Sequence, residues 1–137
     1  MKQVLIIGAG DFGRNLAYAL REGGCCVDIL DRNAASERFA RAQGCRFFCS
    51  DAWNVSDLEG LSVSDYDCCY LCIPSSQPLG LSLSCSVVKR LRQAGAQRVV
   101  VRINRLFDAE DLLQAGADEA VCPEYLAGRM LLSELAD

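Results

Sequence analysis

Histidine is absent from the 137-residue sequence. Its absence excludes Ser-His-Asp triads, Cys-His dyads, histidine-bearing zinc sites and histidine-mediated proton transfer within this chain. Lysine is scarce as well, with two residues against twelve arginines, and the bases form no run. The formal net charge is −4, which gives no electrostatic drive toward nucleic acid or an anionic membrane.

Long apolar runs are also missing, since no stretch approaches the roughly 20 residues that a membrane-spanning helix needs. The first residues enter a short apolar strand without the layout of a signal peptide. We therefore expect a cytoplasmic protein with no nucleic-acid partner and no direct membrane insertion. The length predicts a single domain over residues 1–137, with 51% hydrophobic and 23% charged residues as in soluble globular proteins.

Cysteine is abundant, with nine residues. The number is odd and a chain of this length folds without crosslinks, so a disulfide framework is not expected. Cys69 and Cys72 form a CxxC within the apolar run 68–73, which is predicted to be a buried strand. Residues three apart in a strand face opposite sides and cannot chelate one metal ion. We predict buried, reduced cysteines, with no metal site and no catalytic residue; the alternative is a redox or metal role.

Short apolar runs alternate with helical patterns along the chain. This alternation predicts an α/β fold, a Rossmann-like doubly wound parallel sheet of about six strands with helices on both faces. Apolar residues keep helical spacing over 12–20 and 83–91, and a further helix is expected over 108–115. The predicted strands are 4–7, 27–30, 46–49, 68–73, 98–103 and 119–122.

The final segment, from Pro123 onward, is expected to be a helix. Proline at the first turn with Glu124 beside it is typical of a helix start. Its apolar residues surround too much of the helix for a solvated surface. Either the chain's own sheet or a second subunit is expected to cover it.

The motif Gly8-Ala9-Gly10-Asp11-Phe12-Gly13 follows the first predicted strand and opens the first predicted helix. In this context a GxGxxG motif indicates a dinucleotide site. The first glycine permits a tight turn, the second lets a pyrophosphate approach, and the third lets helix and strand pack closely. The helix N-terminus offers N–H groups and partial positive charge to the phosphates.

Asp31 ends the second predicted strand, 18 residues after Gly13. A carboxylate at this position can accept hydrogen bonds from both ribose hydroxyls and repels a 2′-phosphate. The alternative is that Asp31 only caps the next helix, which is expected to begin near Ala34.

Together these segments resemble the TrkA N-terminal domain family, also called KTN or RCK N-terminal domains. The resemblance covers essentially the whole chain. It rests further on Ser50-Asp51-Ala52, Val101-Arg102-Ile103-Asn104 and, most specifically, Gly116-Ala117-Asp118-Glu119-Ala120-Val121-Cys122-Pro123-Glu124. The family comprises nucleotide-sensing regulatory domains of bacterial potassium transporters and channels. The resemblance thus implies a Rossmann sheet that binds NAD(H), ATP/ADP or AMP.

The resemblance also implies positions for individual residues. Asp51 and Ala52 would lie near the adenine, and Asp31 with Arg32 at the adenosine ribose. The loop from Ile73 to Ser76 would follow the phosphates or the second ribose, and Arg102 and Glu124 would lie toward the phosphates, near a neighbouring subunit or a cation. The candidate binding residues are Gly8, Gly10, Asp11, Phe12, Gly13, Asp31, Arg32, Asp51, Ala52, Ile73, Pro74, Ser75, Arg102 and Glu124.

Two departures from the family pattern bear on the nucleotide. Many members carry acidic-Glu-x-Asn after the fourth strand, where this chain has Ser75-Ser76-Gln77-Pro78-Leu79. ATP-binding members often carry arginine at the position of Asp11. A carboxylate there repels a triphosphate, by about 4 kcal/mol for like charges ~4 Å apart at an effective dielectric near 20. We therefore expect NAD(H) first, AMP or ADP next, and ATP less.

The resulting hypothesis is a non-enzymatic sensor that assembles as a homodimer or larger ring. Nucleotide binding would change the packing between subunits and so control a potassium (cation) transporter or channel. The chain has no histidine, no Tyr-x-x-x-Lys pair and no second domain to hold a substrate. The alternatives are the nucleotide-binding half of an NAD-dependent oxidoreductase and a regulatory domain fused to a phosphoesterase.

Overall fold

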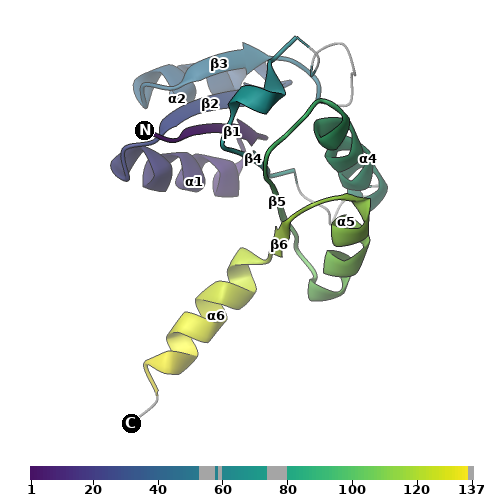
Figure 1. The fold of residues 1–137 in the computed structure, drawn as a ribbon. Helices are drawn as coiled ribbons and strands as arrows, with labels where there is room; N and C mark the ends of the chain where they lie inside the picture. The colour runs from purple at the N-terminus through teal and green to yellow at the C-terminus, as the bar shows by residue number, and fades with distance from the viewer. Residues whose placement is uncertain (53–57, 59, 74–79, 136–137) are drawn as a thin grey trace.

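The computed structural model describes residues 1–52, 58, 60–73 and 80–135 (Figure 1). These residues form a six-stranded, all-parallel sheet in the order β3-β2-β1-β4-β5-β6. The predicted fold class is thereby confirmed. The strands are β1 (Gln3–Ile7), β2 (Cys26–Asp31), β3 (Arg46–Cys49), β4 (Cys68–Leu71), β5 (Val99–Arg102) and β6 (Glu119–Val121).

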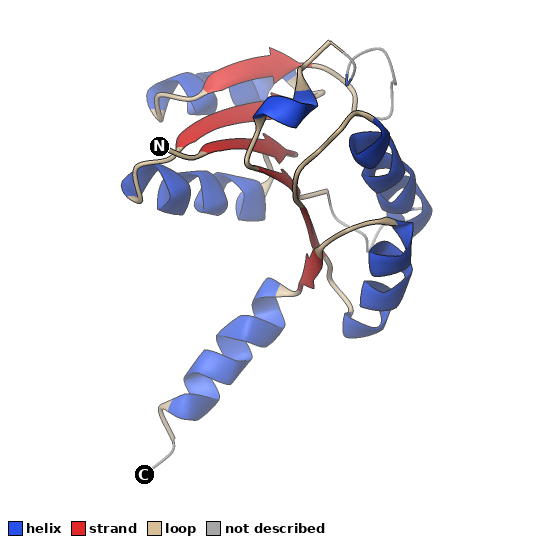
Figure 2. Cartoon of the chain, viewed as in Figure 1, coloured by secondary structure: helices blue, strands red, loops and turns tan. Residues whose placement is uncertain are grey.

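Helices cover both faces of the sheet, because its central strands are apolar on both sides (Figure 2). Alternate strand residues belong to two separate apolar clusters, so that Ile6 and Ile29 pack on one face and Leu5 and Leu30 on the other. The first cluster includes residues of α1 (Asp11–Glu22) and α2 (Glu37–Ala42), and the second those of α4 (Gly80–Gln93) and α5 (Ala109–Ala115). Three short 3₁₀ turns complete the described elements, η1 (Ala34–Ser36), η2 (Val63–Asp65) and η3 (Leu106–Asp108).

β4 is two residues shorter than its apolar run predicts, since it ends at Leu71. At this point the turn after β1 crosses the end of β4, and a Cβ placed on Gly8 would lie 3.2 Å from the Cys72 carbonyl carbon. The predicted alternation of the CxxC thiols is confirmed, because Cys69 packs on the α4 face and Cys72 on the α1 face. Burial raises the pKa of both thiols to about 12.

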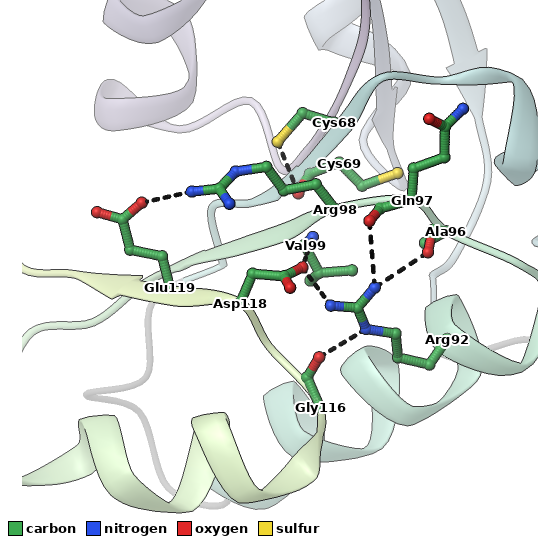
Figure 3. A network of polar contacts seen from close by, with 10 residues as sticks. All are labelled: Cys68, Cys69, Arg92, Ala96, Gln97, Arg98, Val99, Gly116, Asp118 and Glu119. Carbon is green, nitrogen blue, oxygen red and sulfur yellow. Dashed lines mark hydrogen bonds and ion pairs between the residues drawn. The ribbon is translucent and has the colours of Figure 1, made fainter.

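A polar network fixes α4 to the start of β5 and β6 (Figure 3). The Arg92 side chain of α4 donates to the carbonyls of Gly116 at 2.6 Å and Ala96 at 3.0 Å, and pairs with the Asp118 carboxylate. Asp118 also accepts the Val99 N–H at 2.8 Å. The first half of the segment 116–124 therefore holds the α4 layer to the sheet at the amino ends of β5 and β6.

The helix α6 (Pro123–Ser133) begins at the predicted proline and then leaves the sheet (Figure 1). None of its residues is buried. The chain's own sheet thus does not cover this helix, so that the first of the two expectations for it is wrong. Its exposed apolar side chains are Tyr125, Leu126, Met130, Leu131 and Leu132, with Leu135 just beyond its end. None of the helices in the described residues combines the length and apolarity needed to cross a bilayer.

Candidate functional site

A cavity lies at the carboxyl edge of the sheet, where the strand order reverses between β1 and β4. In open α/β sheets this reversal point is the usual place for a ligand. The cavity has a volume of about 240 Å³. We call it the edge cavity; it is lined by Ile7, Gly8, Ala9, Gly10, Leu30, Asp31, Arg32, Ser50, Asp51, Ala52, Cys72, Ile73, Gly80 and Leu83.

The glycine loop, residues 8–13, forms one wall of the edge cavity and leads into α1. Gly8 has φ of +102°, a left-handed conformation that strongly favours glycine. A Cβ on Gly13 would overlap the Gly8 carbonyl oxygen, so the close approach of α1 to β1 requires glycine there. A Cβ on Gly10 would meet no atom within 4 Å, which leaves the backbone of this residue accessible at the cavity wall.

Asp31 joins the end of β2 to the glycine loop. One carboxylate oxygen accepts the Ala9 N–H at 2.6 Å and the other accepts the Asn33 N–H at 2.7 Å. The side chain of Asn33 in turn accepts the Ala35 N–H and caps η1. Because Asn33 is the cap, the interpretation of Asp31 as a mere helix cap does not describe this structure.

Half of the candidate binding residues line the edge cavity. They are Gly8, Gly10, Asp31, Arg32, Asp51, Ala52 and Ile73. Ala52 is buried, while the side chains of Asp31, Asp51 and Ile73 are half-buried and Arg32 is exposed. Pro74 and Ser75 lie outside the described residues.

The structure places the other candidates elsewhere. Asp11 is exposed in the first turn of α1 and lines no described cavity. Arg102 lies on the α1 face of the sheet, with its guanidinium 5.7 Å from the centroid of the Phe12 ring and 2.5 Å from a Glu124 carboxylate oxygen. The Glu124 carboxyl accepts a hydrogen bond from the Glu124 backbone N–H and pairs with Arg102, and these interactions lower the pKa of the carboxyl. Phe12, Arg102 and Glu124 therefore form a second cluster, which lies apart from the walls of the edge cavity.

A second cavity of about 130 Å³ adjoins this cluster under the start of α1. Its walls are almost entirely apolar, and Arg102 is the one described lining residue that carries a charge. Cys72 lines both cavities. The lining residues of the second cavity are Phe12, Leu16, Tyr70, Leu71, Cys72, Val100, Arg102 and Val121.

Sequence reasoning missed part of the edge cavity wall. Ser50 follows β3 directly and was detectable as a neighbour of Asp51. Gly80 and Leu83 come from the first turn of α4, and only the packing of that helix brings them to the cavity. Within the described ranges no group of three or more Cys, Asp or Glu side chains is arranged to hold a metal ion.

Comparison with known proteins gives one family match and several relatives. The TrkA-N domain model matches residues 4–123. The Ktr system potassium uptake protein A of Vibrio alginolyticus is 26% identical over 138 residues, which cover 99% of this chain and 60% of that protein. The uncharacterized protein MG323 homolog of Mycoplasma pneumoniae is 23% identical over 95% of this chain and 54% of its own length. The chain spans a little over half the length of these relatives.

Solved structures with the same fold include a domain of an inner membrane protein and a channel. The TrkA-N domain of inner membrane protein ybaL from Escherichia coli superposes with a TM-score of 0.81 at 19% identity, covering 99% of this chain and 97% of that chain. The GsuK channel bound to NAD gives 0.79 at 18% identity, over 95% of this chain and 23% of the channel. GsuK bound to ADP gives a TM-score of 0.74 at 16% identity, over 88% of this chain and 31% of that chain. These likenesses establish the Rossmann-like fold.

Proposed function

Since the chain belongs to the TrkA-N domain family, we propose that it is a nucleotide-sensing regulatory domain that binds NAD(H) in the edge cavity. The observation that carries this proposal is the junction of Asp31 with the glycine loop at the strand-order reversal. A carboxylate beside the N-terminus of α1 supplies acceptors for ribose hydroxyls next to N–H donors for a pyrophosphate. Both chemistries are needed for a dinucleotide, and the described residues offer both within one cavity.

We rank NAD(H) first, AMP or ADP next, and ATP last. The exposed Asp11 carboxylate in the first turn of α1 opposes a third phosphate near that helix end. The solved GsuK structures with NAD and with ADP support a nucleotide in this fold. In this role Asp51 and Ala52 would hold the adenine side, and Asp31 with Arg32 the adenosine ribose.

We further propose that the domain is not an enzyme and acts on a membrane-embedded potassium (cation) transporter or channel. The sequence holds no histidine for proton transfer, and its relative from Vibrio alginolyticus is a potassium uptake protein. The uncovered apolar side chains of α6 support assembly as a homodimer or larger ring. Nucleotide would act by binding one packing of the subunits more tightly than another.

Two measurements on the purified protein test this proposal. Mass spectrometry of the small molecules released by denaturation should identify NAD(H) or an adenine mononucleotide in stoichiometric amount, or the protein should take up added NADH. Sedimentation velocity should then show an assembly whose sedimentation coefficient changes with NADH. Oxidation of NADH by a small ketone, or reduction of NAD⁺ by a small hydroxy acid, without any change in assembly, would instead support the oxidoreductase alternative.

A further inference from the structure

Arg14 holds two successive carbonyl groups of the glycine loop, although it does not line the edge cavity. Its Nε donates to the Ala9 carbonyl at 2.9 Å, and its backbone N–H donates to the Gly10 carbonyl at 2.9 Å. The guanidinium lies 4.8 Å from the centroid of the Phe39 ring of α2. Tyr18 meets the same ring edge-on, with centroids 5.7 Å apart. The Arg14 side chain is therefore fixed between α1, α2 and the loop.

These two bonds determine where the loop N–H groups point. In a planar trans peptide the N–H is directed opposite to the carbonyl of the same unit. With the Ala9 and Gly10 carbonyls turned toward Arg14, the N–H groups of Gly10 and Asp11 are directed away from it and out of the start of α1. The Ala9 N–H, in contrast, is taken by Asp31. Arg14 and Asp31 thus bind opposite sides of Ala9, one through its carbonyl and the other through its N–H.

We propose that Arg14 is a positioning residue for pyrophosphate recognition, acting through the orientation of the Ala9–Gly10 peptide. The inference rests on the proposed nucleotide function and assigns no contact between Arg14 and the ligand. Without the Nε bond, the Ala9–Gly10 peptide loses its side-chain anchor, and the Gly10 N–H no longer has a fixed direction. Phosphate-bearing ligands then bind less tightly, whereas contacts to the adenosine moiety remain.

The test compares Arg14→Lys and Arg14→Gln with the wild type and with Arg38→Gln. Arg38 is an exposed arginine of α2, so its replacement removes the same charge at a site outside the edge cavity. Binding of NADH is measured by calorimetry, and binding of adenosine by NMR titration, which detects millimolar affinities. Amide spectra of the ligand-free proteins report the environment of Ala9 and Gly10, and thermal unfolding checks that each variant is folded.

We expect both Arg14 variants to lose about tenfold or more in NADH affinity, as for a weakened hydrogen bond to a charged group. Adenosine affinity should stay within about twofold, and the Gly10 amide resonance should shift before ligand is added. Arg38→Gln should behave as the wild type. Full NADH affinity in Arg14→Lys would show that only the charge matters and would overturn the inference. Equal losses for NADH and adenosine would overturn it too, because they indicate general distortion. A wild type that binds no nucleotide would overturn the proposed function as well.

Discussion

The Asp31 carboxylate accepts the Ala9 N–H at 2.6 Å, which links the carboxyl end of β2 to the glycine loop after β1. A carboxylate has about four acceptor positions on its two oxygens. The bonds from Ala9 and Asn33 use two of them, so further hydrogen bonds from ribose hydroxyls remain possible. The same contact fixes the acidic group within the cavity wall, where a 2′-phosphate would meet its charge.

Replacement of Asp31 should weaken nucleotide binding selectively. Hydrogen bonds to a charged group contribute roughly 1.5–3 kcal/mol, so Asp31→Ala should lower NADH affinity about 10- to 150-fold by calorimetry. The discrimination between NADH and NADPH should narrow, because the repelling carboxylate is gone. Glu22→Ala removes an equal charge at the exposed end of α1 and should change neither affinity. Unchanged NADH binding in Asp31→Ala would limit Asp31 to a structural role.

Two glycines of the same loop should respond differently to alanine. Gly13→Ala should destabilise the fold by about 1–3 kcal/mol or more in urea unfolding, because the new Cβ overlaps the Gly8 carbonyl oxygen. Gly10→Ala should leave stability within about 0.5 kcal/mol, since its Cβ meets no atom within 4 Å. It should nevertheless lower NADH affinity at least about tenfold by occupying the space of the pyrophosphate. Normal binding by Gly10→Ala would argue against a phosphate at this wall.

Asp118 should make stability depend on acid pH. The Val99 N–H and then Arg92 lower the pKa of its carboxyl below the usual 3.8. The Asp118 carboxylate therefore raises the free energy of unfolding above pH 3.8, and this stabilisation is lost as the pH falls through the folded-state pKa. Because the side chain is about one-third exposed, screening reduces the effect, and we expect Asp118→Asn to cost about 1 kcal/mol at pH 7.

Urea unfolding at several pH values measures this contribution. The difference between wild type and Asp118→Asn should shrink toward zero as the pH falls below 3.8 and through the folded-state pKa of Asp118. Glu119→Gln is the matched control, since Glu119 and its partner Arg98 are both about half exposed and such pairs contribute little. A pH-independent difference for Asp118→Asn would mean that the charge of Asp118 is not what stabilises the network.

The apolar surface of α6 should mediate self-association. Met130 is 68% exposed, and Met130→Glu should shift the protein from a dimer or larger assembly to a folded monomer in sedimentation at tens of micromolar. Burial of one such side chain contributes about 1.5–3 kcal/mol, so its loss alone weakens the assembly about 10- to 150-fold. Leu106→Glu, on η3, introduces the same charge at another exposed apolar position and should leave the assembly intact. A wild-type monomer, unchanged by nucleotide, would contradict this account of α6.

The sequence predicted the sheet and the part of the edge cavity wall that follows the strand ends, because both depend on local patterns. Alternating apolar runs determine the strand faces, and the carboxyl ends of parallel strands bring the glycine loop, Asp31 and Asp51 to one edge. The sequence did not predict that Arg102 lies apart from the residues of the edge cavity. Arg102 shares the α1 face with Val100, and its Phe12 and Glu124 contacts depend on where α1 and α6 begin.

Other features lay beyond sequence reasoning for a similar reason. The link from Asp31 to the Ala9 N–H and the role of Arg14 at the Ala9 carbonyl depend on individual side-chain conformations. The position of Leu83 at the edge cavity depends on how α4 packs against the sheet. The sequence did not predict that α6 leaves the sheet either, since the apolar pattern of this helix suits burial against the chain's own sheet and against a second subunit equally.

Calorimetric titration of NADH and NADPH into the wild-type protein tests the central claim most directly. We predict saturable binding of NADH at one site per chain, at least about tenfold tighter than NADPH because of the charge of Asp31. Absence of saturable binding for NADH, followed by the same result for AMP, ADP and ATP, would contradict the assignment of the edge cavity as a nucleotide site.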